Sequence, residues 1–125
     1  MYIDDLIGVR YKSGGNGPFY YDCYNYVREI CHRGGKELPF VESEGMEGTD
    51  LSLRELNFVR DNLQKIDEPK NELDLILFKN SKGIMDHIGV YLGNHQFAHC
   101  NKYGGHIEKI ERYKNYIGQV YSWHR

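Results

Sequence analysis

Apolar residues follow a helical period in the first part of the chain. Residues 23–33 place apolar side chains three and four positions apart, after Asp22, a good N-cap, and before Gly34-Gly35, a typical helix end. A glycine-rich loop at residues 13–18 comes just before this segment. The pattern predicts a helix that begins at residue 23, with apolar positions Val27, Ile30 and Cys31.

A second helical pattern follows an acidic, glycine-rich segment at residues 42–48, which we expect to be a surface loop. Ser52 and Glu55 have the spacing of a capping box, in which two side chains satisfy unpaired backbone N–H groups. Pro69 lies beyond the expected end of this helix, and residues 1–7 fit either a short helix or a strand. The apolar face of the second helix would comprise Leu53, Leu56, Val59 or Phe58, Leu63 and Ile66.

After Pro69 the pattern changes to that of β-strands. A run with a single aspartate, residues 73–78, suits a strand buried on both faces. Helices followed by a run of strands predict an α+β domain, with the helices packed on one side of an antiparallel sheet of about five strands. The expected strands are residues 73–78, 84–92, 96–101, 106–110 and 117–123.

The composition fits a single domain that spans residues 1–125. With 40% hydrophobic and 27% charged residues, the chain is typical of soluble globular proteins. The formal net charge of −2 argues against a nucleic acid or a membrane surface as the main partner. No stretch approaches the ~20 apolar residues of a membrane span, and the first residues do not form a signal peptide. We therefore expect a chain that is made in the cytoplasm.

The three cysteines are an odd number, at positions 23, 31 and 100. If Cys23 and Cys31 share one helix, they lie ~12 Å apart, since each residue adds roughly 1.5 Å. That separation exceeds the ~7 Å Cα limit for a disulfide. A disulfide framework is therefore not expected.

Cys23 falls at the start of the predicted helix, where a negative charge is stabilised. Unpaired N–H groups and the helix dipole favour an anion there, and the thiolate is the nucleophilic form of cysteine. The same N–H groups could hold an oxyanion during acyl transfer. Free cysteines are also among the most buried residues, so position alone leaves core packing as the alternative.

A nucleophilic cysteine needs a base, and the hairpin around residues 93–95 offers two histidines. A three-residue loop there would place His87 and His99 on one face of the sheet as diagonal neighbours. A two-residue loop would send them to opposite faces, because a slip of one residue reverses sidedness. The catalytic interpretation therefore needs an odd loop or a bulge. A thiol, a base and a residue that orients the base then form the usual arrangement of an activated nucleophile.

Two other interpretations apply to the histidines. A lone histidine on a strand often serves as a structural hydrogen-bonding group. Structural zinc usually has ligand pairs such as H-x3–5-H, to which only His95 and His99 come close. A loop tip would aim His95 away from the sheet, and Cys100 would point to the face opposite His99. We therefore expect neither a metal nor a cofactor.

Two segments resemble the signature of the NlpC-type cell-wall cysteine peptidases. The first, GVRYKSGGNGPFYYDCYNYV, has the family's Gly-x-x-Tyr, its glycine-rich loop and its Asp-Cys at a helix start. In the second, LDLILF…DHIGVYLGNHQFAHCN, His87 matches the catalytic base and His99 matches the residue that orients it. The resemblance runs from about Gly8 to Asn101. The segment VREICHRGGKELP is most similar to the phage-tail branch of the family.

This resemblance implies a papain-like fold and hydrolysis of amide bonds in the stem peptides of bacterial peptidoglycan. Cys23 would attack the carbonyl as a thiolate, and His87 would take the proton and pass it to the leaving amine while His99 holds the imidazole. Tyr11 would be a substrate or oxyanion contact at the groove wall, and Asp22 would either cap the helix or bind the substrate's free amine. The implied partners are peptidoglycan and, for the phage-tail branch, phage tail proteins. The place of action would be the cell wall, in that branch as part of a virion.

The chain departs from the family pattern in two places. Tyr24-Asn25 follows the cysteine, where the family has a small residue or tryptophan and then glycine, and this change predicts a reshaped groove. Leu73 precedes Asp74, where glycine is common. The alternative functions are an amidase that cuts between sugar and peptide, an injected cell-wall toxin, and a non-catalytic binding or assembly domain. The missing glycine favours the binding domain, and retention of the cysteine and both histidines argues against it.

Overall fold

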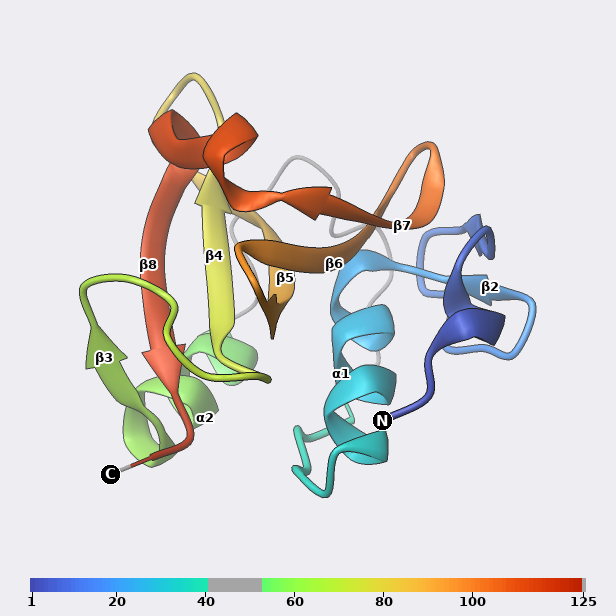
Figure 1. The fold of residues 1–125 in the computed structure, drawn as a ribbon, viewed down its shortest axis with the longest axis horizontal. Helices are drawn as coiled ribbons and strands as arrows, with labels where there is room; N and C mark the ends of the chain where they lie inside the picture. Colours follow the sequence, from blue (N-terminus) through green and yellow to red (C-terminus); the bar gives the residue numbers. More distant parts are fainter. Residues whose placement is uncertain (41–52, 125) are drawn as a thin grey trace.

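The computed structural model describes residues 1–40 and 53–124. Figure 1 shows the arrangement of the elements. In chain order they are η1 (Asp4–Leu6), β1 (Arg10–Tyr11), β2 (Tyr20–Tyr21), α1 (Cys23–Arg33), α2 (Leu53–Asn62), β3 (Gln64–Ile66), β4 (Leu75–Lys79), β5 (Met85–Gly93), β6 (Gln96–Asn101), β7 (Gly104–Lys109), η2 (Ile110–Tyr116) and β8 (Ile117–Ser122).

One antiparallel sheet carries most of the strands. Its order is β3-β8-β4-β5-β6-β7, and β1 and β2 form a separate parallel pair. The predicted α+β class is confirmed, with six strands in the main sheet where about five were expected. The opening segment forms a short 3-10 helix, η1. No helix in the described residues has the length and apolar character that a membrane crossing requires.

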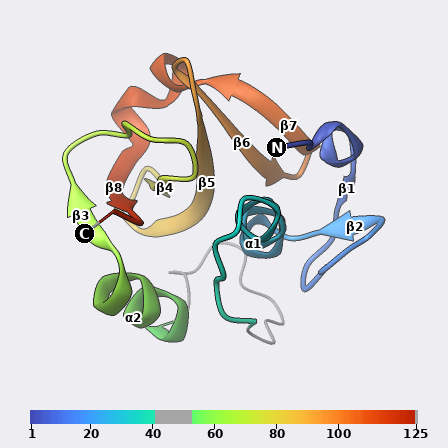
Figure 2. The same cartoon turned by 60° about the horizontal axis from the view of Figure 1, so that its bottom comes forward.

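Helix α1 begins and ends where the sequence predicts. The side chain of Asp22 accepts a hydrogen bond from the backbone N–H of Asn25 at 2.7 Å, which caps the first turn. At the other end the N–H of Gly34 donates to the carbonyl groups of the last turn. Helix α1 lies beside β5 and β6 (Figures 1 and 2). Its apolar face is completely buried, and the members of this face are Val27, Ile30 and Cys31.

Both faces of the sheet are covered by other parts of the chain. Residues of the central strands are therefore apolar whichever face their side chains point to. The core between α1 and the sheet contains Leu75, Leu77, Ile88, Val90, Ala98 and Cys100. A smaller core on the other face contains Ile76, Phe78, Tyr91, Phe97 and Val120, with Ile110 and Tyr113 of η2 packed against it. The interior position of β4 explains the apolar run at residues 75–78, whereas Leu73 and Asp74 precede the strand that was expected to begin at residue 73.

The second helix is shorter than expected. α2 ends at Asn62, and Ile66 lies in strand β3, where it pairs with Val120 of β8. Pairing with β8 and packing against the smaller core fix Ile66 in an extended conformation, so the helical spacing of this position was misleading. Val59 and Leu63 are buried as predicted. The start of the capping box and the acidic segment at residues 42–48 lie outside the described residues.

Candidate active site

A tight turn and a bulge set the sidedness of the β5–β6 hairpin. Asn94 and His95 both have positive φ, 52° and 62°, and Gly93 pairs with Gln96, so the loop has two residues and not three. The register shifts between Tyr91 and Gly93, which accommodates one extra residue. Beyond the bulge the strands regain the register expected for an odd loop. Of the two alternatives left open by the sequence, the loop is the two-residue one, and the bulge gives the sidedness that the catalytic interpretation needs.

The hairpin brings His87 and His99 together, and a glutamate extends the chain of contacts. His87 Nε2 lies 2.8 Å from His99 Nδ1, and His99 Nε2 lies 2.5 Å from Glu108 Oε2. His99 is only 1% exposed, while His87 is half-buried. Two successive hydrogen bonds thus hold the imidazole of a base at the end of this series in one orientation.

The glutamate determines which ring nitrogens carry protons. An ionised carboxylate only accepts, so the proton of neutral His99 lies on Nε2 and its Nδ1 is an acceptor. That acceptor requires the proton of His87 on Nε2, which leaves Nδ1 of His87 with a lone pair. His87 is therefore held in the tautomer that can take a proton from a thiol.

Strand register explains why Glu108 reaches His99. His99 on β6 is paired directly with His106 on β7, and Glu108 lies two residues further along β7 on the same face. Glu108 Oε2 also lies 2.9 Å from His106 Nε2 and 2.7 Å from the hydroxyl of Tyr113 in η2. Glu108 was not among the site residues predicted from the sequence. Its signal was the alternation of His106 and Glu108 opposite a strand that carries a candidate catalytic residue.

Electrostatics at these groups favour a neutral base and an ionised acid. Burial, with smaller contributions from His99 and His106, lowers the pKa of His87 to about 3. Burial also lowers the pKa of His99 to about 4, and the hydrogen bond to Glu108 opposes this shift. Burial raises the pKa of Glu108, but hydrogen bonds from Tyr113 and His99 outweigh it and hold that pKa below its usual value. At neutral pH the pattern is a carboxylate bound to the neutral imidazole of His99, which in turn contacts the neutral imidazole of His87.

The three cysteines have different surroundings. Cys23 is the first residue of α1 and is half-buried, whereas Cys31 and Cys100 are completely buried. Burial raises the pKa of each of the two buried thiols to about 12. Cys23 is therefore the one thiol at a helix start, and the one whose position suits a nucleophile.

A contact with β6 fixes the start of α1. The thiol of Cys100, next to His99 in sequence, donates to the backbone carbonyl of Tyr21 at 3.5 Å, two residues before Cys23. Tyr11 ends β1 and pairs with Tyr21, and both Tyr11 and Cys23 are partly buried against the larger core. Three of the predicted site residues, Tyr11, Asp22 and Cys23, thus lie along β1, β2 and the first turn of α1.

The residues that replace the family's usual pair after the cysteine point inward. Tyr24 is 1% exposed, and its hydroxyl donates to the carbonyl of Pro39 at 2.5 Å. Asn25 is 3% exposed, and its side-chain amide donates to Asp22 at 3.3 Å. These two side chains therefore fill the interior around the helix cap, and the expectation that they reshape the groove does not follow from their placement.

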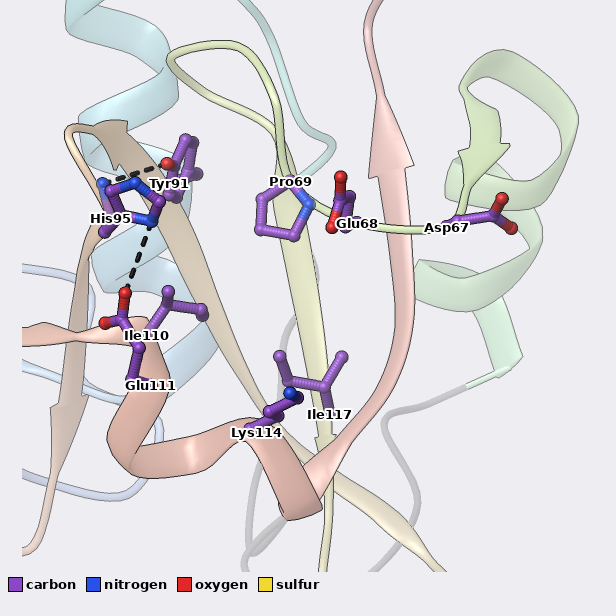
Figure 3. Close-up of a pocket in the computed structure, with 9 residues that line it drawn as sticks. All are labelled: Asp67, Glu68, Pro69, Tyr91, His95, Ile110, Glu111, Lys114 and Ile117. Carbon is purple, nitrogen blue, oxygen red and sulfur yellow. Dashed lines mark hydrogen bonds and ion pairs between the residues drawn. The ribbon is translucent and has the colours of Figure 1, made fainter.

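A separate pocket lies on the face of the sheet covered by η2. Figure 3 shows its lining, with His95 paired to Glu111 at 3.3 Å and the backbone N–H of His95 bonded to the hydroxyl of Tyr91 at 3.0 Å. The cavity has a volume of about 510 Å³. None of the predicted site residues lines it; the lining comprises Asp67, Glu68, Pro69, Tyr91, His95, Ile110, Glu111, Lys114 and Ile117.

Comparison with known proteins gives a match over nearly the whole chain. A model of the NlpC/P60 family matches residues 8–125. The murein DD-endopeptidase MepS/murein LD-carboxypeptidase of Escherichia coli K12 is 36% identical over 106 residues, which cover 82% of this chain and 48% of that protein. The probable endopeptidase p60 of Listeria monocytogenes is 28% identical over 105 residues, covering 83% of this chain and 19% of p60. The chain thus spans about half of one relative and about a fifth of the other.

Solved structures of low sequence identity share the fold. NlpC1 of Trichomonas vaginalis superposes with a TM-score of 0.67 at 21% identity, covering 94% of this chain and 40% of that one. The NlpC/p60 domain of the peptidoglycan hydrolase SagA gives a TM-score of 0.58 at 20% identity, covering 94% of this chain and 89% of that one. This likeness supports the papain-like α+β fold predicted from the sequence.

Proposed function

Because the chain belongs to the NlpC/P60 family, we propose that it is a cysteine endopeptidase that hydrolyses amide bonds in the stem peptides of bacterial peptidoglycan. The names of its relatives MepS and p60 describe endopeptidases, and that of MepS a murein substrate. The observation in this chain that carries the proposal is the hydrogen-bonded series from His87 through His99 to Glu108. It orients one imidazole nitrogen as a base, which a purely structural histidine does not need.

In this mechanism Cys23 is the nucleophile. Nδ1 of His87 takes the thiol proton, and the thiolate attacks the carbonyl carbon of the scissile amide. Backbone N–H groups in the first turn of α1 stabilise the oxyanion. His87 then donates its proton to the leaving amine, and a thioester forms on Cys23. Water, deprotonated by the same nitrogen, hydrolyses the thioester and releases the free thiol.

Tyr11 and Asp22 support the helix start and the groove. The carboxylate of Asp22 accepts hydrogen bonds from the backbone and side-chain amides of Asn25. We therefore assign Asp22 to capping rather than to binding of the substrate's free amine. Tyr11, which like Cys23 is half-buried against the larger core, is proposed as a contact for substrate or oxyanion.

The test is digestion of purified peptidoglycan, with the products identified by mass spectrometry. The wild type should release stem-peptide fragments, Cys23→Ala should release none, and the matched control Cys31→Ala should behave like the wild type if it folds. Fragment masses name the bond. A product pair split between sugar and peptide would replace the endopeptidase by an amidase. A folded wild type that binds peptidoglycan without any cleavage would contradict the enzyme and favour a binding domain.

The setting of this activity is proposed on sequence resemblance alone. Residues 27–39 resemble the phage-tail branch, so we propose that the domain, taken as residues 1–125, acts on the cell wall as part of a phage tail. Mass spectrometry of purified virions should detect this chain in the particles. Its detection only in host cells, together with a neighbouring inhibitor protein, would favour an injected toxin.

A further inference from the structure

A cluster of metal-binding side chain types lies at the end of the histidine series. His99, His106 and Glu108 each offer one ligand atom, and these three atoms all lie within 4.8 Å of one another. This set differs from the His95–His99 pair considered from the sequence, since His95 pairs with Glu111 at the loop. Two imidazoles and one carboxylate are a ligand set typical of Zn²⁺ and related divalent ions.

The contacts of His106 direct its Nε2 toward Glu108. Nδ1 of His106 lies 2.9 Å from the carbonyl oxygen of Gly104, which only accepts, so Nδ1 carries a proton. Nε2, the other ring nitrogen, faces Glu108 Oε2 at 2.9 Å and is the atom that His106 can offer to a metal ion shared with that carboxylate. An imidazole that donates Nδ1–H to a backbone carbonyl is also the usual orientation of a metal ligand.

The cluster is closed on one side and open on the other. His99 is 1% exposed, whereas the side chains of His106 and Glu108 are 31% and 15% exposed. An ion can therefore reach the cluster from the His106 side. Tetrahedral Zn²⁺ separates its ligand atoms by roughly 3.3 Å, given bonds of about 2.0–2.1 Å. Glu108 Oε2 lies 2.5 Å from His99 Nε2 and 2.9 Å from His106 Nε2, so the side chains need to move apart only slightly to hold the ion.

We propose that His99, His106 and Glu108 form an inhibitory site for Zn²⁺. The inhibition rests on the proposed function, whereas the binding does not. A metal ion on Nε2 of His99 moves the ring proton to Nδ1, which then donates to Nε2 of His87 across the 2.8 Å contact. The proton of neutral His87 must then lie on Nδ1, so the lone pair that would accept the thiol proton is lost. Binding thus reverses the hydrogen bonds that Glu108 maintains in the metal-free protein.

Binding is tested first and without substrate, by calorimetric titration of the full chain with zinc chloride. The wild type and Cys23→Ala should bind one ion with the same affinity. His106→Gln should bind at least about tenfold more weakly, while the matched control His95→Gln should bind like the wild type. Loss of binding in Cys23→Ala would place the metal on the thiol and overturn the proposal. Equal binding by folded His106→Gln, or no binding by the wild type, would overturn it as well.

A second measurement needs no variant. Co²⁺ in place of Zn²⁺ should give the visible absorption of a nitrogen and oxygen site. A thiolate-to-metal charge-transfer band would show that Cys23 is a ligand and would refute the cluster. This readout keeps the proposal testable if His106→Gln fails to fold.

Inhibition is tested with the rate of each variant expressed relative to its own metal-free rate. Zinc should suppress peptidoglycan cleavage and slow iodoacetamide labelling of Cys23 in the wild type and in His95→Gln, with recovery on chelation. His106→Gln should require at least about tenfold more zinc for both effects. Binding without any effect on labelling or cleavage would contradict the switch. Absence of cleavage with normal zinc binding would count against the proposed function alone.

Discussion

Replacement of Glu108 by glutamine tests whether the carboxylate positions the catalytic base. In the wild type Glu108 Oε2 faces His99, His106 and Tyr113 at 2.5, 2.9 and 2.7 Å. Glutamine keeps the size of the side chain but removes its charge and adds two N–H donors. The amide can therefore donate to His99 Nε2 as readily as it accepts, and the tautomer of both catalytic histidines is no longer fixed.

The expected loss follows from the strength of the bonds. A hydrogen bond to a charged group contributes about 1.5–3 kcal/mol and a neutral one about 0.5–1.5, so roughly 1–2 kcal/mol of orientation is lost. With 1.4 kcal/mol per factor of ten, kcat should fall roughly five- to thirtyfold. KM should change less than about twofold, because Glu108 contacts the histidines and not the substrate.

The assay is steady-state cleavage of a soluble cross-linked muropeptide, with thermal unfolding measured on the same samples. Glu111→Gln is the matched control, since that exposed glutamate in η2 pairs with His95 and should leave kcat unchanged. A purely structural role would lower the melting temperature and leave the kcat of the folded fraction intact. A Glu108→Gln variant with wild-type kcat would refute the positioning role.

Three further perturbations test other parts of the structure. Near neutral pH iodoacetamide should label Cys23 at least ~100-fold faster than the two buried thiols, because their pKa values lie at about 12. Peptide mass spectrometry measures the three labelling rates, and equal rates would contradict an activated thiol. The bidentate contact of Arg33 lowers the pKa of Asp5. The stabilisation from this ion pair is therefore complete above the pKa of Asp5 in the unfolded chain and is lost as pH falls through its pKa in the folded protein. Asp5→Asn should lower the melting temperature at pH 7, and the difference in melting temperature between variant and wild type should vanish under acid conditions. Gly105→Ala should cost about 1–3 kcal/mol in chemical denaturation, because its Cβ would lie 2.5 Å from the Tyr26 ring, and an unchanged midpoint would refute this packing argument.

Local sequence signals predicted the elements that carry the candidate chemistry. The cap at Asp22, the apolar face of α1 and the apolar run of β4 each depend on residues close in sequence. The cap and the helix face lie where they were expected, and β4 begins at Leu75 instead of residue 73. The shared face of His87 and His99 was predicted only on condition of an odd loop or a bulge. The bulge depends on positive φ at Asn94 and His95, which permits the tighter turn, and the apolar pattern does not encode that choice.

Glu108 could not be assigned from the same signals because its role depends on pairing between strands. Only the register that places His99 opposite His106 brings the glutamate to His99. Ile66 shows the reverse case. Its spacing fits a helix, but pairing of its strand, β3, with β8 gives it an extended conformation.

The proposed function requires that Cys23, with the series of His87, His99 and Glu108 as its base, hydrolyses a stem-peptide amide. The most direct measurement is the rate at which a purified cross-linked muropeptide dimer is converted to monomers by the wild type and by Cys23→Ala, both shown to be folded. We expect monomers with the wild type and none with the variant. Equal conversion by both proteins, or an intact dimer with the folded wild type, would contradict the claim.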